Sequence, residues 1–128
     1  MNAIDQFLKQ DGTALSLRQK RVDILGSNIA NAATPHFKAR DIDFASAFKS
    51  ATSGGDLVKT SAMHIDTGGS ADTTDVKYRV PVSPSVDGNT VELHVEQLQF
   101  AENATQYEAT LQFLGGRIQT LRSAIKGE

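Results

Sequence analysis

An apolar heptad pattern in the last third of the chain, residues 90–126, constrains the fold more than any other feature. Two apolar series run through it at seven-residue spacing, and the steps between them alternate four and three residues. On an α-helix both series fall on one narrow stripe, which is the pattern of a coiled-coil seam. The first series is Phe100, Tyr107, Leu114 and Leu121, and the second is Ala104, Leu111, Ile118 and Ile125.

The predicted C-terminal helix is too long for one compact domain of 128 residues. At about 1.5 Å per residue it would extend for roughly 55 Å. Its apolar stripe therefore needs partners along its whole length, either from the same chain or from other chains.

A second long helix is predicted from Ile4 to Ile29. Helix propensity falls at Asn31, and Pro35 disfavours the α conformation at the preceding residue, so the helix should end between Asn31 and Ala33. Its own apolar stripe recurs every seven residues. The members of this stripe are Leu8, Leu15, Val22 and Ile29.

The basic residues of the N-terminal helix are Arg18, Lys20 and Arg21. They lie away from the apolar stripe or at its margin, which is typical of a solvated face. The alternative is a charged contact with a neighbouring subunit.

Composition excludes several classes of protein. A net charge of −2 and a pI near 5.9 argue against a protein that binds nucleic acid. The chain has no cysteine, which rules out disulfides, thiolate zinc sites and thiol catalysis. No run approaches the ~18 apolar residues of a membrane span, and Asp5 stands where a secretory signal would need basic and then apolar residues. We therefore expect no direct membrane span, and export, if it occurs, by another route.

No constellation of residues predicts catalysis, a cofactor or a metal site. The three histidines, His36, His64 and His94, lie far apart and never at the spacing that puts two imidazoles on one helical face. Glu92 and Glu96 are one turn apart, which is typical of a solvated or inter-subunit helix face. No Gly-x-Ser-x-Gly nucleophile elbow is present. We expect a protein that is not an enzyme.

The middle of the chain is polar and predicted to be irregular. Residues 40–49 predict a short helical turn, and residues 76–82 predict a short strand that Pro81 confines to an edge. The segment between them, about 50–76, is rich in Ser, Thr, Gly and Asp and predicts a mobile loop. Asn89, three residues before Glu92, predicts the N-terminal cap of the last helix.

One segment carries a family resemblance. Residues 27–38 read Ser-Asn-Ile-Ala-Asn-Ala-Ala-Thr-Pro-His-Phe-Lys. This resembles the signature shared by flagellar rod, hook and hook-associated proteins, in which Asn-Ile-Ala-Asn is followed two residues later by Thr-Pro-Gly and an aromatic residue. Residues 39–44, 78–91 and 99–103 are similar to the proximal-rod members of this family. The resemblance covers most of the chain outside residues 48–76.

Two positions depart from that signature. Ala33 stands where the family usually has Asp, and His36 stands where it has Gly. A Gly after Thr-Pro indicates a turn with positive φ, which His adopts less readily, so we expect a local difference in the turn. Asn28 and Asn31 fall in the last turn of the first helix, where their amides can satisfy free carbonyls, and Asn31 is a candidate for the left-handed conformation.

Together, the predicted fold is mainly α, with long N- and C-terminal helices in a coiled-coil-like pair and an irregular, partly extended polar middle. Residues 1–33 and 90–128 form the two helices of one axial domain, and residues 34–89 form the middle region. Leaving such stripes in water costs several kcal/mol at ~25 cal/mol per Å², which favours assembly. The predicted subunit-interface residues are the two series of residues 100–125 with Leu8, Leu15, Val22, Asn28, Ile29 and Asn31.

The resemblance implies a structural subunit of the flagellar rod that self-associates in a helical assembly. It would link the MS ring and the export gate or adapter proteins to other rod proteins, transmit torque, and lie in the periplasm after export by the flagellar type III system without a cleavable signal. The alternative, which the stripes alone do not separate, is a cytoplasmic coiled-coil adaptor or export chaperone.

Overall fold

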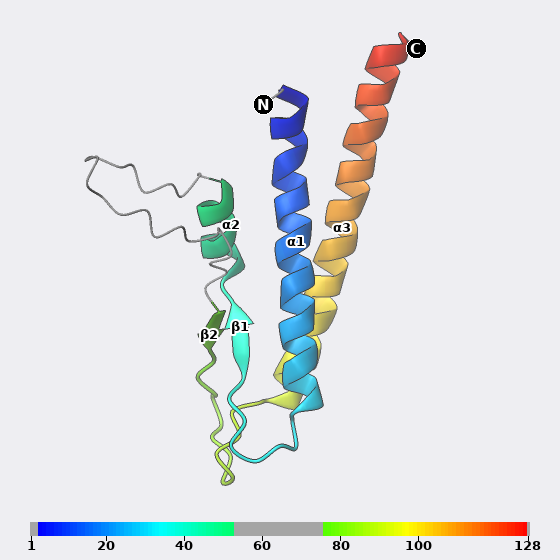
Figure 1. Cartoon of the computed structure of the whole chain (residues 1–128). Helices are drawn as coiled ribbons and strands as arrows, with labels where there is room; N and C mark the ends of the chain where they lie inside the picture. Colours follow the sequence, from blue (N-terminus) through cyan, green and yellow to red (C-terminus); the bar gives the residue numbers. More distant parts are fainter. Residues whose placement is uncertain (1–2, 53–75, 128) are drawn as a thin grey trace, which may run out of the picture.

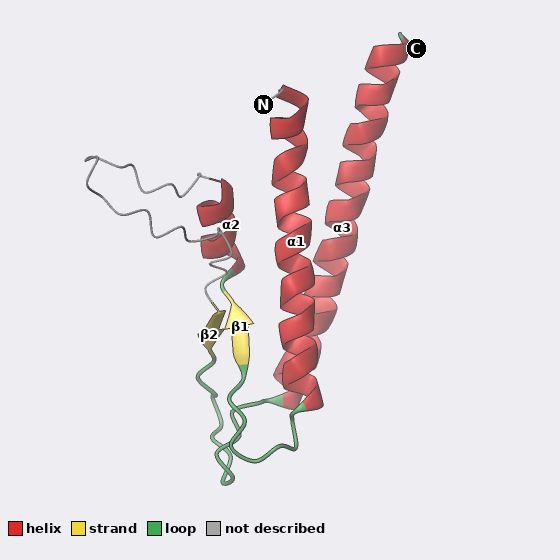
Figure 2. Ribbon diagram, in the orientation of Figure 1, coloured by secondary structure: helices red, strands yellow, loops and turns green. Residues whose placement is uncertain are grey.

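A computed structural model describes residues 3–52 and 76–127. Its elements follow in the order α1 (Ala3–Ala30), β1 (Arg40–Ile42), α2 (Phe44–Thr52), β2 (Val76–Tyr78) and α3 (Leu93–Lys126). Figure 1 shows the two long helices side by side with both chain ends at the same pole of the molecule. The short elements lie beside α1, on the side away from α3 in this view (Figure 2).

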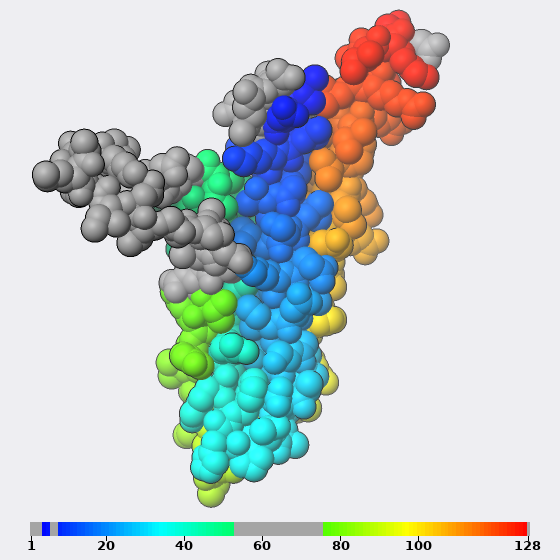
Figure 3. Space-filling model, viewed as in Figure 1, coloured from blue at the N-terminus to red at the C-terminus, as the bar shows by residue number. Residues whose placement is uncertain are grey.

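The predicted fold class is confirmed. Both long helices form and lie in contact, and α1 stands between α3 and the small middle region (Figure 3). At about 1.5 Å per residue, the 34 residues of α3 extend for roughly 51 Å and the 28 residues of α1 for roughly 42 Å.

The end of α1 differs slightly from the prediction. The helix ends at Ala30, one residue before the expected window, and a hydrogen-bonded turn follows. Asn31 donates from its side chain to the Ser27 carbonyl (2.8 Å), so its amide satisfies a free carbonyl as expected. The left-handed conformation suggested for Asn31 is wrong, because His36 is the non-glycine residue with positive φ (61°) among the described residues.

The predicted cap of α3 is also wrong. The helix begins at Leu93 with Glu92 at the cap position, and Glu92 makes no side-chain cap hydrogen bond. Asn89 is buried and donates to the carbonyls of three residues after α1 instead. These are the carbonyls of Asn31, Ala32 and Thr34, at 3.1, 2.9 and 2.9 Å. Asn89 thus links the segment before α3 to the turn after α1.

The middle region is more ordered than expected at its edges. Strands β1 and β2 pair antiparallel, and the predicted helical turn divides into β1 and α2. Residues 50–52 belong to α2 and Val76 to β2, so the predicted loop limits were too wide, and residues 53–75 lie outside the described residues. A small core joins these elements to α1. Its buried members are Leu17, Ile42 and Ala47, with Ile24, Phe44 and Phe48 packed against them.

Candidate assembly surface

The face of α3 that lies against α1 is polar. Gln99 accepts a hydrogen bond from the guanidinium of Arg21 (2.6 Å), and Gln106 accepts one from Arg18. Asn103 is completely buried and donates to the main-chain carbonyl of Arg18 (3.0 Å). Hydrogen bonds therefore form part of the contact between the two long helices.

Toward the C-terminal end of α3, the same face makes an ion pair with α1. The Arg117 guanidinium lies 2.8 Å from the carboxylate of Asp11. The Arg117 side chain is 41% exposed, so solvent screens this pair and its contribution to stability is small.

The predicted apolar stripe of α3 is divided, with the series of Ala104, Leu111, Ile118 and Ile125 turned away from α1 and the other series bordering the helix contact. Phe100, Leu111, Ile118 and Ile125 are 36%, 44%, 49% and 79% exposed. Ala104 is also exposed, whereas Tyr107, Leu114 and Leu121 are half-buried because they lie at the edge of the stripe nearest α1. The series of Ala104, Leu111, Ile118 and Ile125 follows the polar positions by one residue, or roughly 100° around the helix, whereas the series of Tyr107, Leu114 and Leu121 follows them by four residues, or roughly 40°.

The predicted stripe of α1 is partly covered within the chain. Leu8, Leu15, Val22 and Ile29 are all half-buried. The apolar side chains of α1 that are buried are Leu17 and Leu25, at 7% and 0% exposure. Leu17 belongs to the small core with Ile42 and Ala47, so this core draws on a position between the heptad series.

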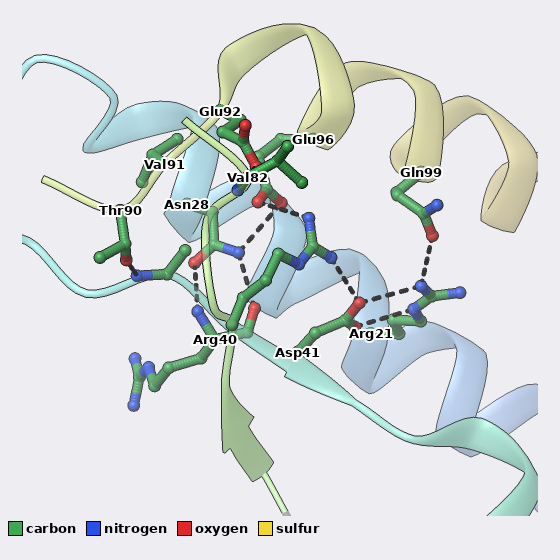
Figure 4. Close-up of polar contacts among 12 residues, drawn as sticks. Arg21, Asn28, Arg40, Asp41, Val82, Thr90, Val91, Glu92, Glu96 and Gln99 are labelled. Atoms are coloured by element: carbon green, nitrogen blue, oxygen red, sulfur yellow. Dashed lines mark hydrogen bonds and ion pairs between the residues drawn. The ribbon is translucent and has the colours of Figure 1, made fainter. Parts of the chain in front are cut away.

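A buried polar network joins α1, β1 and α3 near the start of α3 (Figure 4). Asn28 is completely buried and makes two hydrogen bonds to the main chain of Arg40 in β1. Its side-chain amide donates to the Arg40 carbonyl (2.6 Å) and accepts from the Arg40 N–H (3.1 Å). The same amide donates to the carboxylate of Glu96 (3.0 Å), which is also completely buried. Arg79, which follows β2, completes the network by binding Glu96 at 2.7 Å and Asp41 at 2.5 Å.

Asp41 is the acidic centre of this network. Arg21 binds its two carboxylate oxygens at 2.9 and 3.0 Å. Burial opposes ionisation of Asp41, but the hydrogen bonds from Arg21, Arg79 and the Ile42 N–H outweigh it and lower its pKa. The same contact with Asp41 raises the pKa of Arg21.

Three sequence interpretations are corrected here. Arg18 and Arg21 do not lie on a solvated face, since both bind groups of their own chain, and Arg18 also lies 4.2 Å over the ring of Phe44. Burial, followed by repulsion from Arg21, lowers the pKa of Arg18. Glu96 is buried rather than solvated. Asn28 has its amide bound inside the chain, which leaves it no surface for a neighbouring subunit.

The polar face of α3 has a signal in the sequence. Glu96, Asn103, Thr110 and Arg117 recur at seven-residue spacing, as the apolar series do. Polar residues in one heptad position of a long helix indicate a contact that is fixed by hydrogen bonds.

The turn after α1 holds His36 in a left-handed conformation, with φ at 61°. The positive φ inferred for this position is therefore present although the residue is not glycine. The His36 N–H donates to the carbonyl of Asp87 (3.1 Å), which links this turn to the turn before α3. There Gly88, also with positive φ (76°), has the His36 ring close by, where a Cβ would approach the ring nitrogen Nδ1 to 3.0 Å.

The described residues, 3–52 and 76–127, contain neither a membrane-spanning helix nor a metal-binding cluster. No helix among them is both long and apolar enough to cross a membrane. They contain no group of three or more side chains of the kinds that hold a metal ion.

Comparison with known proteins gives one consistent family. A family model described as "Flagella basal body rod protein" matches residues 11–38. The flagellar basal body rod protein FlgB of Cereibacter sphaeroides (strain ATCC 17029) is 55% identical over 115 residues, which is 90% of each chain. The FlgB proteins of Escherichia coli K12 and Salmonella typhimurium LT2 are 40% and 41% identical, over 98% and 99% of this chain and 97% and 98% of their own lengths.

Proposed function

Because the chain belongs to the FlgB family of flagellar basal body rod proteins, we propose that it polymerises through the apolar stripe of α3. It is a structural subunit of the flagellar basal body rod, not an enzyme, and it assembles with other rod components. Family membership removes the cytoplasmic adaptor or export chaperone as an alternative.

The observation that carries the proposal is the exposure of the stripe. Four large apolar side chains of one helix face, Phe100, Leu111, Ile118 and Ile125, lie in water although a polar face of the same helix is buried. A contiguous exposed apolar surface marks a site of protein interaction. In the rod, helices of neighbouring subunits would cover it.

The partly covered residues extend the proposed interface. Tyr107, Leu114 and Leu121 border the stripe on α3, and Leu8, Leu15, Val22 and Ile29 line α1 with part of their surface free. Asn31, which follows the last residue of α1, is half-buried and remains part of the proposed interface. Asn28 is not part of the proposed interface, because its amide is bound within the chain.

A pair of glycines supports a close approach between helices. Gly115 and Gly116 stand in the middle of α3, where each costs about 1 kcal/mol relative to Ala. A Cβ added at either position would meet nothing within 4 Å in the chain itself. The chain alone gives no reason for these residues, whereas a neighbouring helix that packs closely against α3 would.

The proposed neighbours are other copies of this chain, other rod proteins, and the MS-ring and export-gate or adapter proteins. In this arrangement the subunit lies at the proximal end of the rod, in the periplasm, and transmits torque from the MS ring to the distal rod. The family resemblance of residues 27–44 and 78–103 supports this position.

The test compares two substitutions on α3. Leu111→Asp places a charge in the stripe, and Leu111 is 44% exposed, so the change spares the contact with α1. Phe113→Asp is the matched control, because Phe113 is 71% exposed but lies off the stripe. We expect Leu111→Asp to abolish motility and rod assembly while the purified monomer keeps its helix content by circular dichroism. Motile cells with Leu111→Asp, or equal loss with both variants, would contradict the proposal.

A further inference from the structure

Three polar contacts between α1 and α3 follow one heptad position of α3. Glu96, Asn103 and Arg117 each bind a group of α1, namely Asn28, the carbonyl of Arg18, and Asp11. Glu96 and Asn103 are both completely buried. The helix contact is thus a ladder of polar groups that runs the length of the overlap.

This arrangement is not the one that the hydrophobic effect alone favours. Burial of polar groups is costly unless they are bonded, while burial of the neighbouring stripe of α3 against α1 would be favourable. A rotation of α3 about its axis by one residue, or roughly 100°, would exchange the two faces. Some contact must therefore hold α3 in the observed orientation.

We propose that Asn103 is the residue that fixes the rotation of α3 against α1 and so keeps the apolar stripe turned outward. This inference rests on the proposed function, because an outward stripe matters only if neighbouring subunits bind it. A single buried Asn in a helix contact is known to select one orientation over others at a cost in stability.

Asn103 is singled out by its place in the ladder. Glu96 acts at the first turn of α3 and leaves the rest of the helix free, and Arg117 is 41% exposed and weakly held. Asn103 lies between them. Its Oδ1 and the Nε of Arg18 are buried without a hydrogen-bond partner among the described residues, so this contact is poorly optimised for stability. It is better explained by the orientation that it selects.

The absence of cysteine allows a direct test on the purified monomeric chain. Single cysteines are placed at Ala104 on the stripe, at Thr110 on the face toward α1, and at Thr120, an exposed position roughly 160° around the helix from Ala104. Their rates of alkylation are measured in the parent sequence and with Asn103→Ala. Thr105→Ala serves as the matched control, because Thr105 is exposed and its side chain contacts only its own helix among the bonds described.

We expect Asn103→Ala to slow alkylation at Ala104→Cys by about tenfold, to speed it at Thr110→Cys, and to leave Thr120→Cys unchanged. Thr105→Ala should change none of the three rates. Unchanged rates with Asn103→Ala would overturn the inference. A uniform increase at all three positions would also overturn it, because it would mean that Asn103 merely stabilises the helix pair.

The assay separates this inference from the proposed function, since it needs no assembly. If the alkylation pattern shifts as expected but Leu111→Asp cells stay motile, Asn103 sets the rotation of α3 but the stripe is not the interface. If the pattern does not shift and Leu111→Asp abolishes motility, the stripe is the interface and another contact orients it.

Discussion

Replacing Arg79 with methionine should destabilise the fold by about 3–5 kcal/mol, because the change leaves a buried carboxylate without its cation. The Glu96 side chain is 0% exposed and Arg79 is 17% exposed, with 2.7 Å between the Arg79 Nη1 and Glu96 Oε1 atoms. Methionine keeps an unbranched apolar stem and removes the charged guanidinium. Asn28 would remain as a neutral donor to Glu96.

Most of the lost stability in Arg79→Met should come from the unpaired carboxylate of Glu96. Asp41, the other partner of Arg79, keeps both hydrogen bonds from Arg21. If so, Glu96→Gln should recover much of the loss in the Arg79→Met background, because a neutral amide costs less to bury than an unpaired carboxylate. A double-mutant cycle should give a coupling energy above about 1 kcal/mol.

Lys77→Met is the matched control. Lys77 is two residues earlier in the chain and lies 4.0 Å from Asp43, but these side chains are 54% and 51% exposed. Its loss should cost at most about 1 kcal/mol. Urea unfolding of each purified variant, followed by far-ultraviolet circular dichroism, gives the free energies of unfolding. Similar losses for Arg79→Met and Lys77→Met would refute the reasoning from burial.

Three further substitutions test the other contacts. Asp41→Asn should lower the free energy of unfolding at neutral pH and flatten the decline of that free energy below about pH 4. The lowered pKa of Asp41 gives stability that is present above the unfolded pKa and is lost as the pH drops below the unfolded pKa. An unchanged pH profile of urea unfolding would contradict this. His36→Gly should raise the free energy of unfolding by about 1 kcal/mol, because it relieves a left-handed His, and a lower melting temperature would count against that view. Asn89→Asp removes the donor to three carbonyls after α1 and should cost about 1–3 kcal/mol in urea unfolding, whereas a neutral result would show those hydrogen bonds to be dispensable.

The sequence predicted the helices and the apolar stripe, because heptad spacing is a local property that can be read along the chain. It did not predict which face of α3 meets α1. Glu96 was interpreted as solvated because nothing near it in the sequence shows that Arg79 and Asn28 converge on it. Asn89 was assigned to the cap of α3 for a similar reason: Glu92 three residues later completes a capping pattern, whereas the Asn89 amide donates to the carbonyls after α1.

The ladder between α1 and α3 also sets the order in which the chain can fold. Its three contacts join residues separated by 68, 85 and 106 positions. Contacts of such long range form late and slowly, because a large loop must close before any of them is made. A chain that enters a compartment with its N-terminus first therefore cannot complete this ladder until almost its whole length has arrived. The ladder is therefore complete only when residues from both ends of the chain have come together.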